Sequence, residues 1–267
     1  MLPWTLDEIS WIRLEPERAR ADSTIYYMVA AASFIETAAD LYSANLVAFF
    51  SDPALRRWLA KNWEQEELQH GRALRRYIEA VWPELDWGRG YAAFFAEYSP
   101  LCRREQLEQH PALELAARCV VETGTSTFYT ALHRRAEEPV LRELSDRIRQ
   151  DEVRHYTRFR QFLDLHRSRE NIGRASVLGA LWRRVREVQN EDAYLGFKHA
   201  WLMRHPGGTF EDARFERFRA ELRGVMDGCY PYRMALQMVL QPLDLNRTLV
   251  RLSLPLLEHA ARSRMFA

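Results

Sequence analysis

The stretch NWEQEELQHG, residues 62–71, lies inside a segment that otherwise follows the pattern of an amphipathic helix. Apolar residues lead into this stretch and out of it at helical intervals, at Leu59, Trp63, Leu74, Ile78 and Val81. Continued through the stretch, the same stripe falls on Glu67 and His70, because positions three and four apart share one helix face. A carboxylate and an imidazole therefore stand where this helix should place core residues.

A carboxylate and an imidazole interrupt an apolar stripe again in DEVRH, residues 151–155. Both stretches contain Glu-x-x-His, first as Glu67 with His70 and then as Glu152 with His155. Each pair can direct an oxygen and a nitrogen to one point, since residues three apart share a helix face. A single motif of this kind is weak evidence, but both pairs interrupt apolar rows, which argues against an exposed position.

Two more glutamates complete a repeated pattern. Glu36 in AAASFIETAADLY and Glu122 in RCVVETGTSTFYTAL each interrupt an apolar stripe. Glu36 precedes Glu67 by 31 residues, and Glu122 precedes Glu152 by 30 residues. The chain therefore contains two similar helix pairs, and each pair offers one glutamate followed by one Glu-x-x-His motif.

Four isolated carboxylates in a helical core are costly, whereas two divalent cations balance their four negative charges. We therefore interpret six residues as metal ligands: Glu36, Glu67, His70, Glu122, Glu152 and His155. This is the ligand set of ferritin-like dinuclear carboxylate bundles. Oxygen and nitrogen ligands without a thiolate favour iron or manganese over structural zinc. The alternative is that these are ordinary helix residues paired with arginines. That interpretation requires a separate explanation for each of the six positions.

An acidic residue stands immediately before the glutamate of each Glu-x-x-His motif, Glu66 before Glu67 and Asp151 before Glu152. Ligating histidines usually donate their second N–H to a carboxylate outside the ligand set. In a two-fold arrangement we expect these pairs to cross, with Asp151 orienting His70 and Glu66 orienting the other histidine. The alternative is that both acids are solvated surface charges.

Glycine and proline are scarce and clustered, which leaves long periodic segments between them. These segments predict helices over 22–50, 53–82, 111–136, 138–168, 175–204, 210–226, 230–241 and 246–265. The stretch WGRGYAAFFAEYSP is interpreted as part of a long connection. We therefore expect an all-α protein, with a ferritin-like four-helix bundle in residues 1–170 and a C-terminal helical extension over 171–267 packed on it.

The composition narrows the functional class. A net charge of +1 over 267 residues argues against nucleic acid or an anionic membrane as the main partner. The three cysteines have no CxxC spacing, which fits a reducing compartment better than a disulfide framework. No signal pattern begins the sequence, and IYYMVAAASFI is too short to span a bilayer. We expect a soluble cytoplasmic protein.

Among non-haem diiron oxidases, the motifs resemble those of the soluble acyl-carrier-protein desaturases. EELQHGRALRRY resembles the desaturase pattern EExRHG followed by a leucine and a tyrosine, and DEVRH resembles DEKRH. ETGT, residues 122–125, resembles ERAT. The resemblance covers residues 30–165, whereas residues 1–20 and 175–267 match nothing in that family.

The resemblance implies a pair of iron ions that uses O2 to desaturate or hydroxylate an unactivated carbon of an acyl chain or a similar apolar substrate. It also implies an electron donor, either a ferredoxin or a reductase, and an acyl carrier protein or a small apolar substrate as partner. The electron donor must be separate, because the chain has no cysteine cluster or nucleotide fingerprint. A manganese–iron pair and a homodimer stay open.

Two residues near Glu122 are further candidates, Thr125 from the same resemblance and Gly124 from its small size. Thr125 corresponds to the threonine of ERAT that faces the oxygen-binding side, which makes it a candidate proton donor in catalysis. The alternative is a threonine that bonds its own helix backbone. Gly124 leaves room for a substrate channel beside the metals, although close helix packing explains a glycine equally well.

Two other functions share this ligand set. One is a ferritin-like iron-binding or ferroxidase-type protein without an organic substrate, and the other is an N-oxygenase of the same fold. Arylamine N-oxygenases carry an extra histidine where this chain has Ile148, and radical-generating reductase subunits carry a tyrosine where it has Leu74. These differences favour a desaturase or hydroxylase. A metal-free helical scaffold is the remaining alternative.

Overall fold

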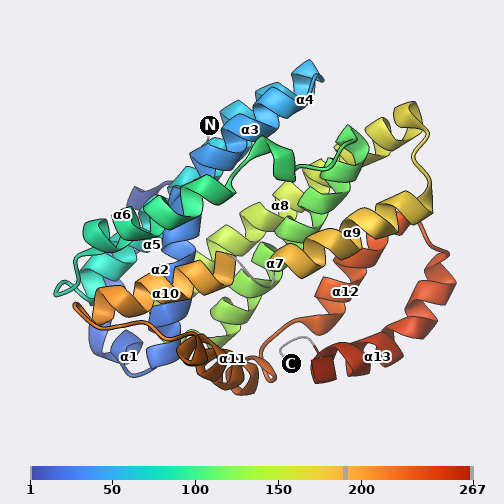
Figure 1. The fold of residues 1–267 in the computed structure, drawn as a ribbon. Coiled ribbons are helices and arrows are strands. Elements are labelled where there is room, and N and C mark those ends of the chain that lie inside the picture. The colour runs from blue at the N-terminus through green and yellow to red at the C-terminus, as the bar shows by residue number, and fades with distance from the viewer. Residues whose placement is uncertain (1, 189–191, 265–267) are drawn as a thin grey trace.

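A computed structural model describes residues 2–188 and 192–264, and all regular elements within these ranges are helical (Figure 1). The all-α class expected from the sequence is thus confirmed. None of the described helices combines the length and the apolar character that crossing a membrane requires.

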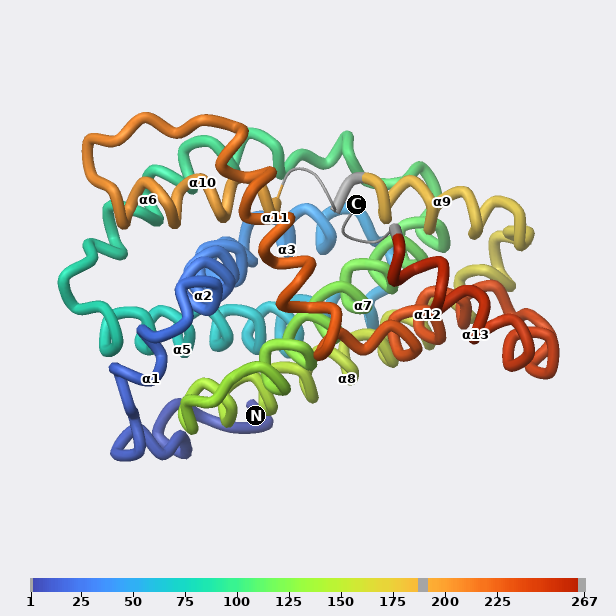
Figure 2. The backbone as a smooth tube through the Cα atoms, turned by 90° about the horizontal axis from the view of Figure 1, so that it is seen from below, coloured from blue at the N-terminus to red at the C-terminus, as the bar shows by residue number. Residues whose placement is uncertain are grey.

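Four helices contain the predicted ligands: α2 (Ser23–Thr37), α5 (Glu64–Val81), α7 (Pro111–Arg135) and α8 (Pro139–Glu170). The most extensive helix packing in the described chain joins α7 to α8, and the next joins α2 to α5. Only residues 136–138 separate α7 from α8, so these helices form a tight hairpin. Figure 2 shows α7 and α8 running side by side, with α2 against α5 next to them.

The other helices surround this group. They are α1 (Pro16–Arg20), α3 (Ala39–Phe49), α4 (Pro53–Trp58), α6 (Trp87–Tyr98), α9 (Arg174–Val188), α10 (Asp192–Arg204), α11 (Asp212–Met226), α12 (Tyr232–Leu240) and α13 (Arg247–Arg264). Helices α9 and α12 pack on α7, while α10 packs on α2 and α6 (Figure 1). Helices α9, α10 and α12 of the C-terminal region therefore lie against the two helix pairs.

Local sequence explains where the principal helices begin and end. Asp52 accepts hydrogen bonds from the first backbone N–H groups of α4, and Pro53 occupies the first turn. Glu138 caps α8 in the same way, with Pro139 as its first residue. Helix α8 ends at Asn171, whose φ of 53° is the left-handed conformation that terminates many helices.

The hydrophobic core has two apolar clusters with a polar layer between them. On α7, apolar residues between Ala112 and Val120 belong to one cluster, while Tyr129, Ala131 and Leu132 belong to the other. The predicted ligand Glu122 lies between these two segments. Helix α8 repeats the arrangement, because Ile148 belongs to one cluster and Tyr156 to the other. The predicted ligands therefore share one layer of the core, closed by apolar residues above and below.

The structure corrects two predictions of secondary structure, and a third lies partly outside the described residues. WGRGYAAFFAEYSP is not a connection, because Trp87–Tyr98 forms α6, which starts at the N-cap Asp86 and buries Trp87, Phe94 and Tyr98. Apolar spacing outweighed its two glycines. The predicted helix 22–50 is divided at Ala38 into α2 and α3. The predicted helix 175–204 includes residues 189–191, which lie outside the described residues, and α9 and α10 flank them.

The segment that leads into α5 also departs from a plain α-helix. Leu59–Trp63 forms a π-helical turn that joins α4 directly to α5. Such turns insert an extra residue into the helix and occur mostly at functional positions. Here the turn ends four residues before Glu67, so it sets the rotation with which the motif enters the core.

Candidate metal centre

The six predicted ligands come together in the polar layer as two overlapping groups. In each group, one ligand atom from every member lies within 4.8 Å of the others. The first group is Glu36, Glu67, His70 and Glu152, and the second is Glu67, Glu122, Glu152 and His155. Each group has three carboxylates and one imidazole, and all members are buried. The groups share Glu67 and Glu152, which therefore lie where they can bridge two ions.

The two histidines are oriented by the crossed carboxylates. His70 Nε2 lies 2.9 Å from Asp151 Oδ2, and His155 Nε2 lies 3.1 Å from Glu66 Oε2. With Nε2 engaged outside the cluster, each histidine directs Nδ1 into it. His70 Nδ1 is 3.2 Å from Glu152 Oε1. The Nδ1 atoms are thus the ones available to a metal.

The atoms that face the cluster are buried and lack hydrogen-bond partners. They are His70 Nδ1, His155 Nδ1, Glu122 Oε2 and Glu152 Oε1. Buried polar atoms are almost always paired, because leaving them unpaired costs the full desolvation penalty. Two cations would satisfy all four atoms and balance the four carboxylate charges. The donor set, with oxygen and nitrogen and no thiolate, fits iron or manganese.

Burial and crowding of like charges perturb the carboxylates. Burial, together with the charges of Glu152 and Glu36, raises the pKa of Glu67 well above its usual range. Burial also raises the pKa of Glu122 to about 7. For Glu36, burial acts in the same direction, but the hydrogen bond and charge of His70 outweigh it and lower the pKa. The metal-free cluster therefore retains protons that a metal would displace.

The histidines are perturbed in the complementary direction. Burial by itself lowers the pKa of His70, but the hydrogen bond to Asp151 and the nearby carboxylate of Glu152 outweigh it and raise the pKa well above its usual value. His155 follows the same logic through Glu122 and Glu66. A cluster of strongly shifted groups in one buried layer is the pattern that marks a candidate functional site.

The carboxylates behind the histidines are held by residues that the sequence analysis did not identify. Trp4 Nε1 donates to Asp151 Oδ2 at 2.8 Å. Arg154, inside the DEVRH motif, contacts both Asp151 and Glu66, so one guanidinium links the two outer carboxylates. No pattern around Trp4 indicated this role, because the segment meets α8 only in the tertiary structure.

Two aromatic side chains donate to the candidate ligands themselves. Trp63 Nε1, at the end of the π-helical turn, donates to Glu122 Oε1 at 3.2 Å. Tyr129 OH donates to Glu36 Oε1 at 2.5 Å. Both rings also pack in the core, which is the role their apolar spacing indicates. Their polar atoms restrict the rotamers of the two glutamates that belong to only one group each.

The structure places Thr125 on a shared glutamate. Thr125 Oγ1 donates to Glu152 Oε2 at 2.5 Å, and it also lies 3.3 Å from the Glu122 carbonyl oxygen. The bond to its own helix backbone, which is the sequence-based alternative, is thus present, and the contact with Glu152 places the hydroxyl beside the cluster. The neighbouring Gly124 is half-buried, and a β-carbon built there would meet no atom within 4 Å. Close helix packing therefore does not explain this glycine.

Gly71, directly after His70, allows α5 to approach α2. A β-carbon at this position would lie 2.7 Å from the backbone nitrogen of Thr37 and 2.8 Å from its Cα. Such distances to backbone atoms require the helices to separate. Because Thr37 follows Glu36, the glycine keeps Glu36 and His70 within reach of one ion.

Two comparisons with known proteins found no match for this chain. No protein-family model matches this chain. No significant match was found among curated proteins either. The buried cluster itself, together with the motif resemblance, thus supports a metal centre.

Proposed function

We propose that this protein is an O2-dependent non-haem diiron oxidoreductase with a ferritin-like arrangement of α2, α5, α7 and α8. Its reaction is the desaturation or hydroxylation of an unactivated carbon in an acyl chain or a similar apolar substrate. The observation that carries the proposal is that two four-residue groups share Glu67 and Glu152. Shared carboxylates hold two cations next to each other, as dinuclear oxidases require.

The six ligands divide into bridging and terminal positions. Glu67 and Glu152 would bridge, Glu36 and His70 would complete one site, and the remaining glutamate and histidine of α7 and α8 would complete the other. When bound, two irons supply the redox chemistry for O2. A manganese–iron pair could use the same oxygen and nitrogen donors.

The surrounding protein controls orientation and water. Asp151 and Glu66 accept the Nε2 protons of the histidines, which fixes the tautomer that leaves Nδ1 free to bind metal. The apolar clusters on both sides exclude bulk water from the polar layer. A dry, oriented site strengthens electrostatic interactions with developing charge and protects reactive species from side reactions.

Thr125 is the proposed proton donor. Its hydroxyl hydrogen is shared with Glu152 Oε2 at 2.5 Å. The threonine can thus hold a proton at Oγ1, one contact from a bridging carboxylate. Gly124 beside it has open space on the side of its missing β-carbon, and we propose this side for the apolar substrate.

The electron donor and the form in which the substrate arrives are also proposed. Electrons would come from a separate ferredoxin or reductase, and the substrate would arrive as a small apolar molecule or on an acyl carrier protein. The motif resemblance supports both.

The first experiment is metal analysis of protein from iron-supplied cells, with Glu67→Ala as the variant. We expect two irons per chain in the unaltered protein and loss of both in the variant, because Glu67 belongs to both groups. Glu79→Ala, which removes an exposed carboxylate from the same helix, is the matched control. Two irons retained in Glu67→Ala would refute the ligand assignment.

A single-turnover experiment separates oxidation of a substrate from iron handling. The diferrous protein is mixed with O2 and extracts containing acyl chains, and both O2 consumption and organic products are measured. Oxidised product in stoichiometric yield supports the proposed function. Consumption of O2 with release of ferric iron and no product would favour a ferroxidase-type role instead.

A further inference from the structure

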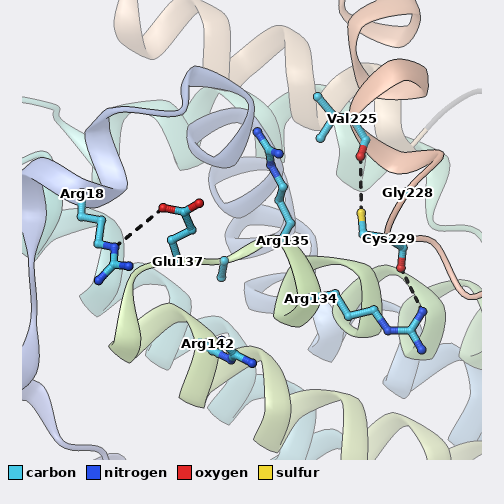
Figure 3. Close-up of a pocket in the computed structure, with 9 residues that line it drawn as sticks. Arg18, Arg134, Arg135, Glu137, Arg142, Val225, Gly228 and Cys229 are labelled. Atoms are coloured by element: carbon cyan, nitrogen blue, oxygen red, sulfur yellow. Dashed lines mark hydrogen bonds and ion pairs between the residues drawn. The ribbon is translucent and has the colours of Figure 1, made fainter.

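A cavity of about 530 Å³ lies where the α7–α8 hairpin meets α1 and the end of α11 (Figure 3). Its charged lining residues are Arg18, Arg134, Arg135, Arg142 and Glu137. Four arginines and one glutamate give the lining a formal charge of +3. The whole chain has a net charge of only +1, so the rest of the chain carries a formal charge of −2.

The arginines come from three helices and are held around the opening. Arg135 is tied to Asp22 by an ion pair of 2.6 Å. Arg134 Nη1 donates to the carbonyl oxygen of Cys229 at 3.1 Å, and Arg18 lies 3.9 Å from Glu137 (Figure 3). These contacts fix the positions of three guanidinium groups and leave some of their N–H donors free.

Arg142 is the exception. It is exposed, and within the described ranges its guanidinium makes no hydrogen bond or ion pair. It stands in the first turn of α8, where the positive end of the helix dipole offers a cation no benefit. The helix dipole therefore does not favour an arginine at this position, whereas binding of an anionic ligand would account for it.

A second cavity of about 210 Å³ adjoins the first and shares Arg18, Arg135, Ala136 and Glu137 with it. Its additional lining has the apolar residues Ala19, Ala21, Ile25 and Leu141 and the acidic residues Asp22 and Glu138. Both acids are already engaged, Asp22 by Arg135 and Glu138 by the first backbone N–H groups of α8. The combined hollow thus offers cationic groups on one side and an apolar floor on the other. A ligand that fills both carries an anionic head and an apolar organic part.

We propose that this hollow binds a small organic phosphate. Guanidinium groups recognise phosphate oxygens through paired N–H donors, and arginine clusters are characteristic of phosphate sites. A phosphate monoester carries about two negative charges at neutral pH. The four arginines can balance them, although Glu137, Asp22 and Glu138 reduce the formal charge of the combined lining to +1. The concave shape and the balanced charge of the whole chain favour a small molecule over a polyanionic macromolecule.

The site is separate from the metal centre. Arg134 follows Glu122 by 12 residues on the same helix, which is about 18 Å at the rise of an α-helix. A short organic phosphate in the hollow therefore does not touch the cluster. The proposal holds whether or not the chain is an oxidase, and metal-free protein can test it.

The test combines calorimetry with protection of a cysteine. The probes are inorganic phosphate, pyrophosphate and hexyl phosphate, titrated into the full chain. We expect saturable binding of one ligand per chain, with hexyl phosphate tighter than inorganic phosphate because its chain reaches the apolar floor. Cys229 lines the cavity, so bound ligand should slow its alkylation by iodoacetamide. Cys102, which is also part-exposed but lies elsewhere, is the internal reference.

The charge-reversal variant Arg142→Glu should weaken binding by about tenfold or more. It replaces an exposed residue, and a thermal melt verifies that it folds. Arg56→Glu reverses an exposed arginine of α4, outside the hollow, and should bind as the unaltered chain does. Absence of saturable binding, equal losses in both variants, or no protection of Cys229 would each overturn the proposal. Binding only to phosphatidic acid vesicles would overturn the soluble ligand in favour of a lipid head group.

Discussion

His70 Nε2 lies 2.9 Å from Asp151 Oδ2, an oxygen that also accepts from the indole of Trp4. The histidine on α5 is thus oriented by a carboxylate on α8, while its Nδ1 points into the cluster without a hydrogen-bond partner. One buried carboxylate determines the tautomer of a candidate ligand from 81 residues away in the sequence.

Asp151→Asn should therefore weaken metal binding without removing a ligand. Loss of such an outer carboxylate typically reduces metal affinity by about 10- to 100-fold. Competition with a chelator of known affinity measures the change. Asp164→Asn alters an exposed carboxylate on the same helix and should have no effect. Unchanged affinity in Asp151→Asn would show that the contact does not orient the histidine.

Gly71→Ala should disturb the site without altering any candidate ligand. The new β-carbon would lie 2.8 Å from Thr37 Cα, so α5 and α2 must separate. Overpacking of this kind costs about 1–3 kcal/mol, and it moves His70 away from Glu36. We expect a lower melting temperature and incomplete metal loading, measured by calorimetry and metal analysis.

Gly224→Ala is the matched control for that variant. Gly224 lies in α11, and a β-carbon there meets nothing within 4 Å. Removing a glycine from a helix at such a position is neutral or slightly stabilising. Equal behaviour of the two variants would show that the close approach at Gly71 is not required.

Metal should stabilise the protein more at neutral than at acidic pH. The pKa of Glu122 is raised to about 7, so between its usual pKa and that value the folded metal-free chain holds a proton that the unfolded chain has lost. Stability of the metal-free form therefore falls as pH rises through this window. The raised pKa of His70 acts in the same direction, because its stabilising contribution is complete below the usual histidine pKa and is lost above it.

A bound metal displaces these protons and removes the repulsion. The increase in melting temperature caused by Mn2+ should therefore grow from about pH 5.5 to about pH 7.5. Chelator-treated and Mn2+-loaded samples measured across this range provide the comparison. A larger increase at the acidic end would contradict the protonation scheme.

Gly124→Phe tests the proposed position of the substrate. The space beside Gly124 can receive a ring without a clash at the β-carbon. We expect the variant to bind two metals and to react with O2, yet to lose substrate-dependent turnover. Thermal stability is measured in parallel, because a ring that disturbs packing typically costs about 1–3 kcal/mol. A stable, metal-replete and fully active variant would place the channel elsewhere.

Helical periodicity and the repeated motifs predicted the helical class and the burial of the candidate ligands. Leu141, Leu144 and Ile148 recur at helical spacing within the predicted helix 138–168, and all three are buried. The same periodicity placed Glu67 and His70 inside rather than on the surface, because residues three apart must share a face. The helix at Trp87–Tyr98 was not predicted, because the glycines at its start indicated a connection. In the structure this helix packs against α2 and α10.

The sequence by itself determined the helical class, the burial of the six candidate ligands and the pairing of each glutamate with its histidine, because these depend on spacing along one helix. Only the tertiary structure decided which contacts form between helices. Trp4 reaches Asp151, Trp63 reaches Glu122 and Tyr129 reaches Glu36 across long stretches of chain. Such contacts depend on how packed helices rotate and cross, and Gly71 and the π-helical turn before α5 contribute to that packing in ways that no local periodicity encodes.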